Sequence, residues 1–263
     1  MKVFRKDKIV ELCTGKKVLH LGFIQHHDLY EKKMAEGDWL HERINSVASH
    51  LVGVDYLQDD VAVIREKYGY EVYFADVTNI EDMRRVKDSI GNTVDVVVCG
   101  ELIEHVDNPG LMLDNLKCFM EENTILIITT PNPFSYQRMK LMTKGKYESE
   151  WLNKEHVSWY SYQTLKQLLS RKGYAEVDYG YYDGEVQDEE EFKLKCLIKN
   201  IVPLSKWHYS QELYDGLFFV ASIHRTKIRG GGADSRYFLV FCGFTIDDIL
   251  VLKVDNLQFR RAA

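Results

Sequence analysis

The sequence lacks a basic excess, a closely spaced cysteine pair and a long apolar run. Its formal net charge is −6, which disfavours binding to the phosphate backbone of a nucleic acid. The five cysteines are dispersed and form no Cys-x-x-Cys pair, a pattern typical of reduced thiols in a cytoplasmic protein. No apolar run reaches the roughly 18 residues of a membrane helix, and the N-terminal residues show no signal peptide. We therefore expect a cytoplasmic protein without a membrane partner.

The composition is that of a globular chain with a substantial core. It has 263 residues, of which 45% are hydrophobic and 28% charged. Short segments rich in Val, Ile and Leu predict strands that are covered on both faces. They span residues 17–21, 51–55, 71–75, 94–99 and 124–129. Helical patterns separate them, so the sequence predicts an α/β fold with a Rossmann-like, doubly wound and mostly parallel sheet.

The last third of the chain is less regular. Strand patterns at 174–182 and 217–223 flank an insertion at 183–214, which we expect to form a lid and whose residues 187–201 have a charged, helical pattern. A run of three glycines after Arg229 then breaks the pattern, and further strand-like residues follow it. We therefore expect a main domain over 1–228 and a tail over 229–263 that adds strands or forms an appendage.

Glycines and carboxylates follow the predicted strands, where open α/β sheets bind their ligands. Gly22 follows the first strand and permits close approach of the backbone to a ligand. Asp55 ends the second strand and can accept hydrogen bonds from ribose hydroxyls. After the third strand, Asp76 can accept from an adenine amino group while Val77 packs on the ring. Together, these groups suit a ligand that contains ribose and adenine.

This arrangement resembles the class I methyltransferases that use S-adenosylmethionine (SAM). The resemblance runs from about residue 17 to 174 and rests on VLHLG, LVGVD, FADV, VDVVVCGELIEHVDNPG, LIITTPNPFS and HVSWYSYQTLKQLLSRKGY. The last three phrases resemble ubiquinone-pathway and sugar-cluster O-methyltransferases. The resemblance implies SAM as cofactor and a seven-stranded sheet whose last strand is antiparallel. The cofactor-binding residues it suggests are His20, Gly22, Gln25, Asp55, Tyr56, Asp76, Val77, Gly100 and Glu101.

The first loop departs from the family pattern. Related proteins have an acidic residue and two or three glycines there, whereas this chain has His20 and only Gly22. The interval from Gly22 to Asp55 also exceeds the roughly 20 residues of such units, which indicates an insertion at 26–39. The alternative interpretation of this first loop is a Rossmann-like domain that no longer binds a ligand. The absence of Gly-x-Gly-x-x-Gly argues against a nicotinamide dehydrogenase.

The segment after the fourth strand carries candidate chemistry. In a helical turn, Glu101, Glu104 and His105 would share one face, and His156 follows the fifth strand. These groups could hold a divalent cation such as Mg²⁺, Mn²⁺, Fe²⁺, Co²⁺ or Zn²⁺. The E-x-x-E-H pattern with a later histidine resembles the metal-binding set of ubiquinone O-methyltransferases and of small-RNA 2′-O-methyltransferases. By that resemblance, Glu101, Glu104, His105 and His156 bind the metal.

Two other interpretations of these residues stay open. Without a metal, His105 or His156 could act as a general base. Alternatively, Glu101 orients the cofactor and the Glu-His pair is structural.

We predict a SAM-dependent O-methyltransferase that acts on a hydroxyl of a saccharide, a nucleotide-sugar or another small metabolite. The alternatives are an RNA 2′-O-methyltransferase, which the net charge disfavours, and a non-catalytic methyltransferase-like scaffold. The sequence does not indicate an oligomeric state.

Overall fold

The structure of the chain is a computed structural model. It describes residues 5–24, 29–91, 93–147, 153–182 and 214–223, together with the backbone of 237–241, 249–253 and 260–261. The chain divides into two compact units, Met1–His224 and Arg225–Ala263. The expected lid insertion lies outside the described residues, apart from its last residue, Tyr214.

A seven-stranded sheet forms the centre of the first unit, in the order β3-β2-β1-β4-β5-β7-β6. The strands from β1 to β5 pair in parallel, and β7 is antiparallel to both β5 and β6. The predicted Rossmann-like, mostly parallel sheet is therefore confirmed. Its strands are β1 (Lys17–Leu21), β2 (His50–Asp55), β3 (Val72–Phe74), β4 (Val96–Gly100), β5 (Ile125–Pro131), β6 (Tyr174–Tyr182) and β7 (Gly216–Ile223).

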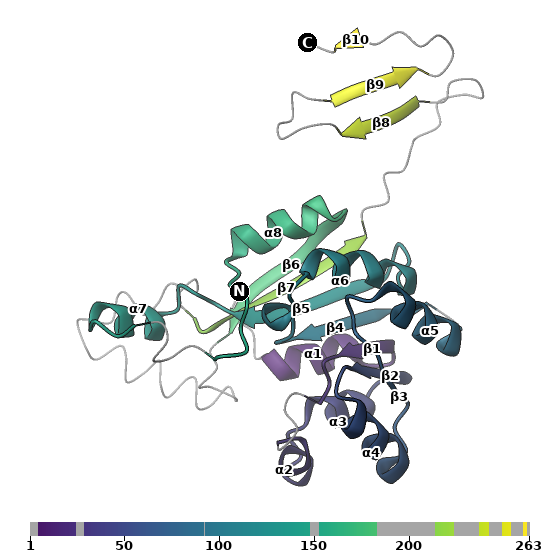
Figure 1. Ribbon diagram of the computed structural model, residues 1–263, viewed down its shortest axis with the longest axis vertical. Coiled ribbons are helices and arrows are strands. Elements are labelled where there is room, and N and C mark those ends of the chain that lie inside the picture. Colours follow the sequence, from purple (N-terminus) through teal and green to yellow (C-terminus); the bar gives the residue numbers. More distant parts are fainter. Residues whose placement is uncertain are drawn as a thin grey trace. The chain divides into compact units, whose positions relative to one another are not determined.

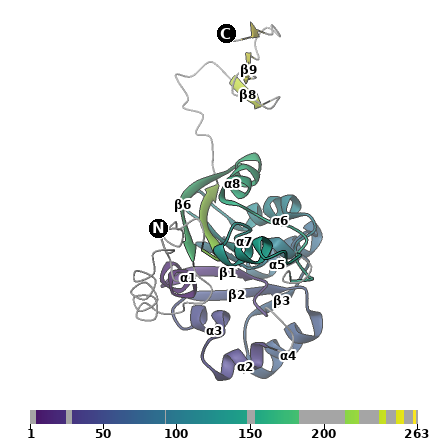
Figure 2. The same cartoon turned by 90° about the vertical axis from the view of Figure 1, so that its left-hand side faces the viewer.

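Helices cover both faces of this sheet (Figures 1 and 2). Residues of α5, α6 and α8 pack on one face, while residues of α1 and α3 pack on the other. The α-helices of the unit are α1 (Arg5–Cys13), α2 (Tyr30–Ala35), α3 (Leu40–Asn45), α4 (Gln58–Tyr68), α5 (Ile80–Ile90), α6 (Pro109–Leu116), α7 (Tyr136–Thr143) and α8 (Tyr162–Arg171). Two 3-10 helices, η1 (Ile103–His105) and η2 (Lys117–Phe119), flank α6.

Side-chain alternation along the strands assigns residues to the two faces. In β4, Val97 and Cys99 join the core under α5, α6 and α8, whereas Val96 and Val98 join the core under α1 and α3. All four side chains are at most 1% exposed. A strand buried on both faces needs apolar residues at every position, which explains the near-continuous Val and Ile runs.

The interval between β1 and β2 contains two short helices, α2 and α3. Trp39, between them, is fully buried, and its indole Nε1 donates to the carbonyl oxygen of Phe23 at 3.0 Å. Tyr30, Trp39 and Phe23 pack with residues of α4 in a separate apolar cluster. The extra residues of this interval therefore fold against the sheet with a core of their own.

The second unit contains three antiparallel strands, in the order β10-β9-β8. They are β8 (Tyr237–Phe241), β9 (Ile249–Lys253) and β10 (Arg260–Arg261). Within the described part of the chain, no helix is long and apolar enough to cross a membrane.

Gly53 of β2 leaves space for His41 of α3. A Cβ atom at position 53 would lie 2.9 Å from side-chain atoms of His41, Phe23 and Val72. We expect Gly53→Ala to lower the free energy of unfolding by about 1–3 kcal/mol through overpacking. Gly100→Ala is the matched control, because its Cβ would meet nothing closer than 3.7 Å. Thermal unfolding of both variants tests this; equal stability would contradict the packing argument.

Candidate active site

A cavity of about 770 Å³ opens beside the carboxyl ends of the parallel strands. The ends of β1, β2, β3 and β4 meet there because parallel neighbours end at the same edge of the sheet. Most residues singled out in the sequence line this one cavity. They are Gly22, Asp55, Tyr56, Asp76, Val77, Gly100, Glu101, Glu104, His105 and His156.

The cofactor candidates among them are held in place by local hydrogen bonds. Gly22 has φ +61°, a left-handed conformation that favours glycine. The buried Asp55 carboxylate accepts from the backbone N–H of Ile24 at 3.0 Å and of Leu57 at 3.2 Å. Burial raises the pKa of Asp55, although the backbone donors oppose this shift. Asp55 therefore fixes the first loop as well as facing the cavity.

Asp76 presents a carboxylate from an exposed turn after β3. Its Oδ1 accepts from both the backbone N–H and the hydroxyl of Thr78 at 2.8 Å. Both bonds use the same oxygen, so the turn does not depend on Oδ2.

His20, which the resemblance assigned to the cofactor, does not line the cavity. Its side chain is 1% exposed on the α3 side of β1, and its ring stacks on that of His41. The two Nδ1 atoms are 3.2 Å apart. Burial lowers the pKa of His20 to about 3, with a contribution from Arg5, so the ring is neutral. The alternation along β1 turns His20 into the core, while Gln25 lies outside the described residues.

Contrary to the sequence prediction, Glu101 does not share a helical face with Glu104 and His105. It has φ +53°, and the 3-10 helix η1 begins only at Ile103. Its Oε1 accepts a hydrogen bond from the hydroxyl of Tyr182 at 2.5 Å. A left-handed non-glycine residue is strained and needs such support. Glu101 therefore faces the cavity from outside the helical turn.

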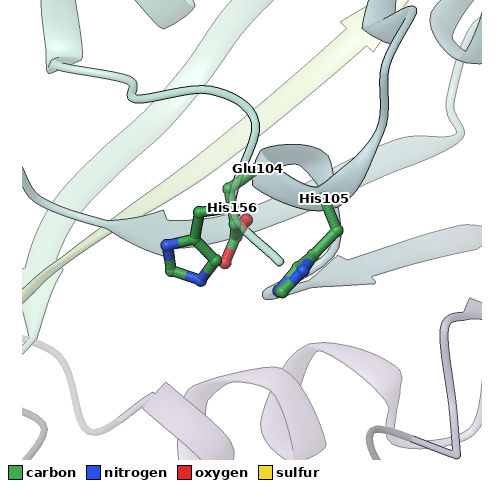
Figure 3. Close-up of side chains that lie close together, drawn as sticks. All are labelled: Glu104, His105 and His156. Atoms are coloured by element: carbon green, nitrogen blue, oxygen red, sulfur yellow. The ribbon is translucent and has the colours of Figure 1, made fainter. Parts of the chain in front are cut away.

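Glu104, His105 and His156 come together in one cluster (Figure 3). One potential ligand atom from each residue lies within 4.8 Å of the others. The imidazole rings of His105 and His156 meet edge to face, with centroids 4.7 Å apart. The backbone carbonyl of Glu104 accepts from the N–H groups of Val157 and Ser158 at 2.9 and 3.2 Å, which anchors the loop that carries His156.

The buried polar atoms of this cluster have few partners. Glu104 is 1% exposed, and neither carboxylate oxygen has a donor in hydrogen-bonding geometry among the described residues. Burial, and then the charge of Glu101, raises the pKa of Glu104 to about 9. Nδ1 of His156 is likewise buried without a partner there, and burial and His105 lower the pKa of His156. The cluster thus combines a carboxyl group that resists ionisation with a neutral imidazole.

A family profile described as a methyltransferase domain matches residues 6–179. The chain belongs to this methyltransferase family. A curated relative, the ubiquinone biosynthesis O-methyltransferase of Glaesserella parasuis serovar 5 (strain SH0165), is 26% identical over 145 residues. That match covers 53% of this chain and 56% of the relative, so the chain spans only about half of the relative's length.

Solved methyltransferase structures share the fold. A SAM-dependent methyltransferase from Archaeoglobus fulgidus is 19% identical, with a TM-score of 0.51 over 82% of this chain and 90% of its own. A possible histamine N-methyltransferase from Thermotoga maritima is 12% identical, with a TM-score of 0.52 over 84% and 87%. The predicted methyltransferase family and Rossmann-like fold are therefore confirmed.

The methyltransferase cavity contains two cations that the sequence motifs did not indicate, Arg5 of α1 and Lys33 of α2. Nη1 of Arg5 is buried without a hydrogen-bonding partner in the described part of the chain. The guanidinium of Arg5 lies over the ring of Tyr182, 5.7 Å from its centroid. Neither cation is part of a recognisable motif, so only the packing of α1 and α2 brings them to the site.

The raised pKa of Glu104 predicts a pH-dependent stability. The native state keeps this proton above the ordinary carboxyl pKa, so stability is lost as pH rises toward about 9. Without divalent cations, the stability of Glu104→Gln relative to the wild type should therefore increase as pH rises. We expect a midpoint about 2–4 °C higher at about pH 8, a shift that about 1 kcal/mol produces, and a smaller difference at about pH 5. Thermal unfolding in chelator measures both, with the exposed Glu66→Gln as control. A difference that does not grow with pH would contradict a neutral Glu104.

Proposed function

We propose that this methyltransferase transfers the methyl group of SAM to a hydroxyl of a saccharide, a nucleotide-sugar or another small metabolite, with a divalent cation at Glu104, His105 and His156. The observation that carries the proposal is the position of this cluster in the same cavity as the residues suited to a nucleoside. The name of the ubiquinone O-methyltransferase relative supports oxygen as the methylated atom. The acceptor class rests on the resemblance to sugar-cluster enzymes.

The cofactor roles follow from the groups at the strand ends. Asp55 accepts from the ribose hydroxyls, and Asp76 accepts from the adenine amino group through Oδ2. Val77 is partly buried and packs on the adenine ring. Tyr56, which is 67% exposed, lines the same cavity. Gly22 and Gly100 allow the backbone to approach the cofactor closely.

The donor set of the cluster fits a divalent cation. Two imidazole rings and a carboxylate are ligands that Mn²⁺, Fe²⁺, Co²⁺ or Zn²⁺ accept, and the orphaned oxygens of Glu104 would gain a partner. When bound, such a cation lowers the pKa of an acceptor hydroxyl that it coordinates. Glu101 is a neighbouring carboxylate and a further candidate ligand, although its Oε1 accepts from Tyr182 in this structure.

The histidines can also take the acceptor proton. The lowered pKa of His156 leaves its imidazole neutral near pH 7, so it can act as a general base. When bound, SAM would supply an electrophilic methyl group to the acceptor oxygen and would leave as S-adenosylhomocysteine, while His156 would hold the proton of the acceptor hydroxyl. Positioning of the two reactants supplies much of the rate, because both bind in one cavity.

Two expectations from the sequence stay proposals. The dispersed cysteines support a cytoplasmic location. The RNA 2′-O-methyltransferase alternative is disfavoured by the net charge of −6, and a gel shift with small RNA would test it.

Titration calorimetry with SAM tests the cofactor roles. Asp76→Asn keeps Oδ1 for the Thr78 turn but replaces the acceptor Oδ2 with a donor. We expect SAM affinity to fall about tenfold, the effect of one lost hydrogen bond of about 1.4 kcal/mol. An S-adenosylhomocysteine analogue with a 6-oxo purine should bind the variant better than the wild type. An unchanged preference for adenine would remove Asp76 from the site, and absent SAM binding by the folded wild type would favour the scaffold alternative.

Mn²⁺ titration after chelation tests the cation site. Glu104→Gln and His156→Ala should each weaken Mn²⁺ binding at least about tenfold, because each removes a ligand. Wild-type affinity should rise with pH toward about 9, since the cation must displace the Glu104 proton. Glu101→Gln should have a smaller effect, and Glu66→Gln none. If Glu101→Gln matches Glu104→Gln, Glu101 is a ligand; if no variant changes the binding, the cluster is not the cation site.

A further inference from the structure

Contacts from two other strands hold Glu101 in one orientation. Tyr182 ends β6 and is 6% exposed, and its hydroxyl donates to Oε1 of Glu101 at 2.5 Å. The backbone N–H of Glu101 donates to the carbonyl oxygen of Thr129 in β5 at 2.9 Å. Glu101 itself has φ +53°, a conformation that few residues other than glycine adopt. The strained backbone is thus fixed by β5, and the carboxylate is fixed by β6.

The fold makes room for the ring of Tyr182 at Gly216 of β7. The two residues lie opposite each other in the antiparallel pair of β6 and β7. A Cβ atom at position 216 would overlap the ring of Tyr182, so the ring covers Gly216 because that residue has no side chain. The guanidinium of Arg5 also lies over this ring, 5.7 Å from its centroid. Packing within the protein therefore directs the hydroxyl of Tyr182 at Glu101.

The hydrogen bond to Tyr182 separates the carboxylate of Glu101 from the cluster of Glu104 and the two histidines. Tyr182 belongs to the core under α1 and α3. The 3-10 helix η1, which carries Glu104, packs its Ile103 into the core on the opposite face of the sheet. In the described part of the chain, the cluster of close ligand atoms does not include Glu101.

Glu101 is nevertheless a neighbour of this cluster. Glu101 and Glu104 line the same cavity. Burial, and then the charge of Glu101, raises the pKa of Glu104 to about 9. A glutamate side chain is flexible, so the carboxylate of Glu101 can turn toward a nearby cation when no hydroxyl holds it. A second carboxylate ligand would fill a coordination position and favour cations that prefer oxygen ligands.

We propose that Tyr182 is a positioning residue that keeps Glu101 out of the ligand set of the cation. Glu104 and the two histidines then bind the cation alone, and its remaining coordination positions stay open for the acceptor hydroxyl. Catalytic zinc sites have the same arrangement, with about three protein ligands and one open position. The inference rests on the proposed cation site. It gives Tyr182 and Gly216, which lie outside the motifs that resemble the family, a part in cation selection.

Calorimetric titrations with Mn²⁺ and Mg²⁺ after chelation test the proposal. Tyr182→Phe keeps the ring over Gly216 and removes the hydroxyl, so Glu101 is released. We expect the affinity for Mn²⁺ to rise about fivefold and the affinity for Mg²⁺ to rise more, because the added ligand is a carboxylate. Glu101→Gln in the Tyr182→Phe background should remove this gain, because the gain depends on the carboxylate of Glu101.

Tyr174→Phe is the matched control. Tyr174 lies in the same strand, is 3% exposed, and its hydroxyl donates to the carbonyl oxygen of Leu113 at 2.7 Å. This variant loses a buried tyrosine hydroxyl that is bonded elsewhere, so its affinities for both cations should equal those of the wild type. Circular dichroism checks that each variant is folded.

The single variant Glu101→Gln tests the same proposal without any change at Tyr182. While Tyr182 holds Glu101, this substitution should change the Mn²⁺ affinity by less than about threefold. A loss of about tenfold or more would show that Glu101 is already a ligand, and the restraint would be wrong. This measurement decides the question even if Tyr182→Phe does not fold.

The outcomes separate this inference from the proposed function. If the wild type binds Mn²⁺ and the folded Tyr182→Phe binds it equally or more weakly, the restraint is wrong while the cation site stands. A gain that persists in the double variant would also overturn the restraint, because it would not pass through Glu101. If only Tyr182→Phe binds a cation, the restraint stands and the cation site of the native chain fails. If neither folded protein binds Mn²⁺ or Mg²⁺, both proposals fail.

Discussion

Burial of the parallel strands on both faces is the constraint on which the rest of this structure depends. Strands such as β4 have no face left for polar chemistry, because α1 and α3 cover one side and α5, α6 and α8 the other. The carboxylates of the site follow the strands, where the backbone leaves the sheet. Asp55, Asp76 and the Glu104 turn therefore lie around one cavity, although they come from different parts of the chain.

Glu104 departs from the rule that buried polar groups are paired, as do Nη1 of Arg5 and Nδ1 of His156. Its carboxyl group lies in the interior without a hydrogen-bond donor from the described residues, which costs stability in the absence of a ligand. The backbone carbonyl of the same residue anchors the loop of His156, so the local fold brings the imidazole to the carboxyl group. A site that is poorly satisfied by the protein itself is suited to a ligand that completes it.

Local patterns in the sequence predicted the strands and the polar residues that follow them, because both depend on neighbouring residues in the chain. Apolar runs placed the strands, and the residues after them, such as Asp55 and Asp76, lie at the cavity as expected. His20 was misplaced because motif comparison ignored the alternation of side chains, which buries it against His41. The left-handed backbone of Glu101 depends on Tyr182, far away in the chain. No periodicity or motif can indicate such a partner, because only the pairing of β5, β6 and β7 brings it close.

Arg5 and Lys33 were missed for the same reason, because no motif indicates that α1 and α2 bring these side chains to the cavity. A glycine-rich loop binds through its backbone and loses much conformational entropy on folding. A longer inserted segment adds little further loop-closure entropy, and this one brings its own anchor in the buried Trp39. Anchored in this way, the segment places Lys33 of α2 at the cavity although the chain between β1 and β2 is longer than in the family pattern.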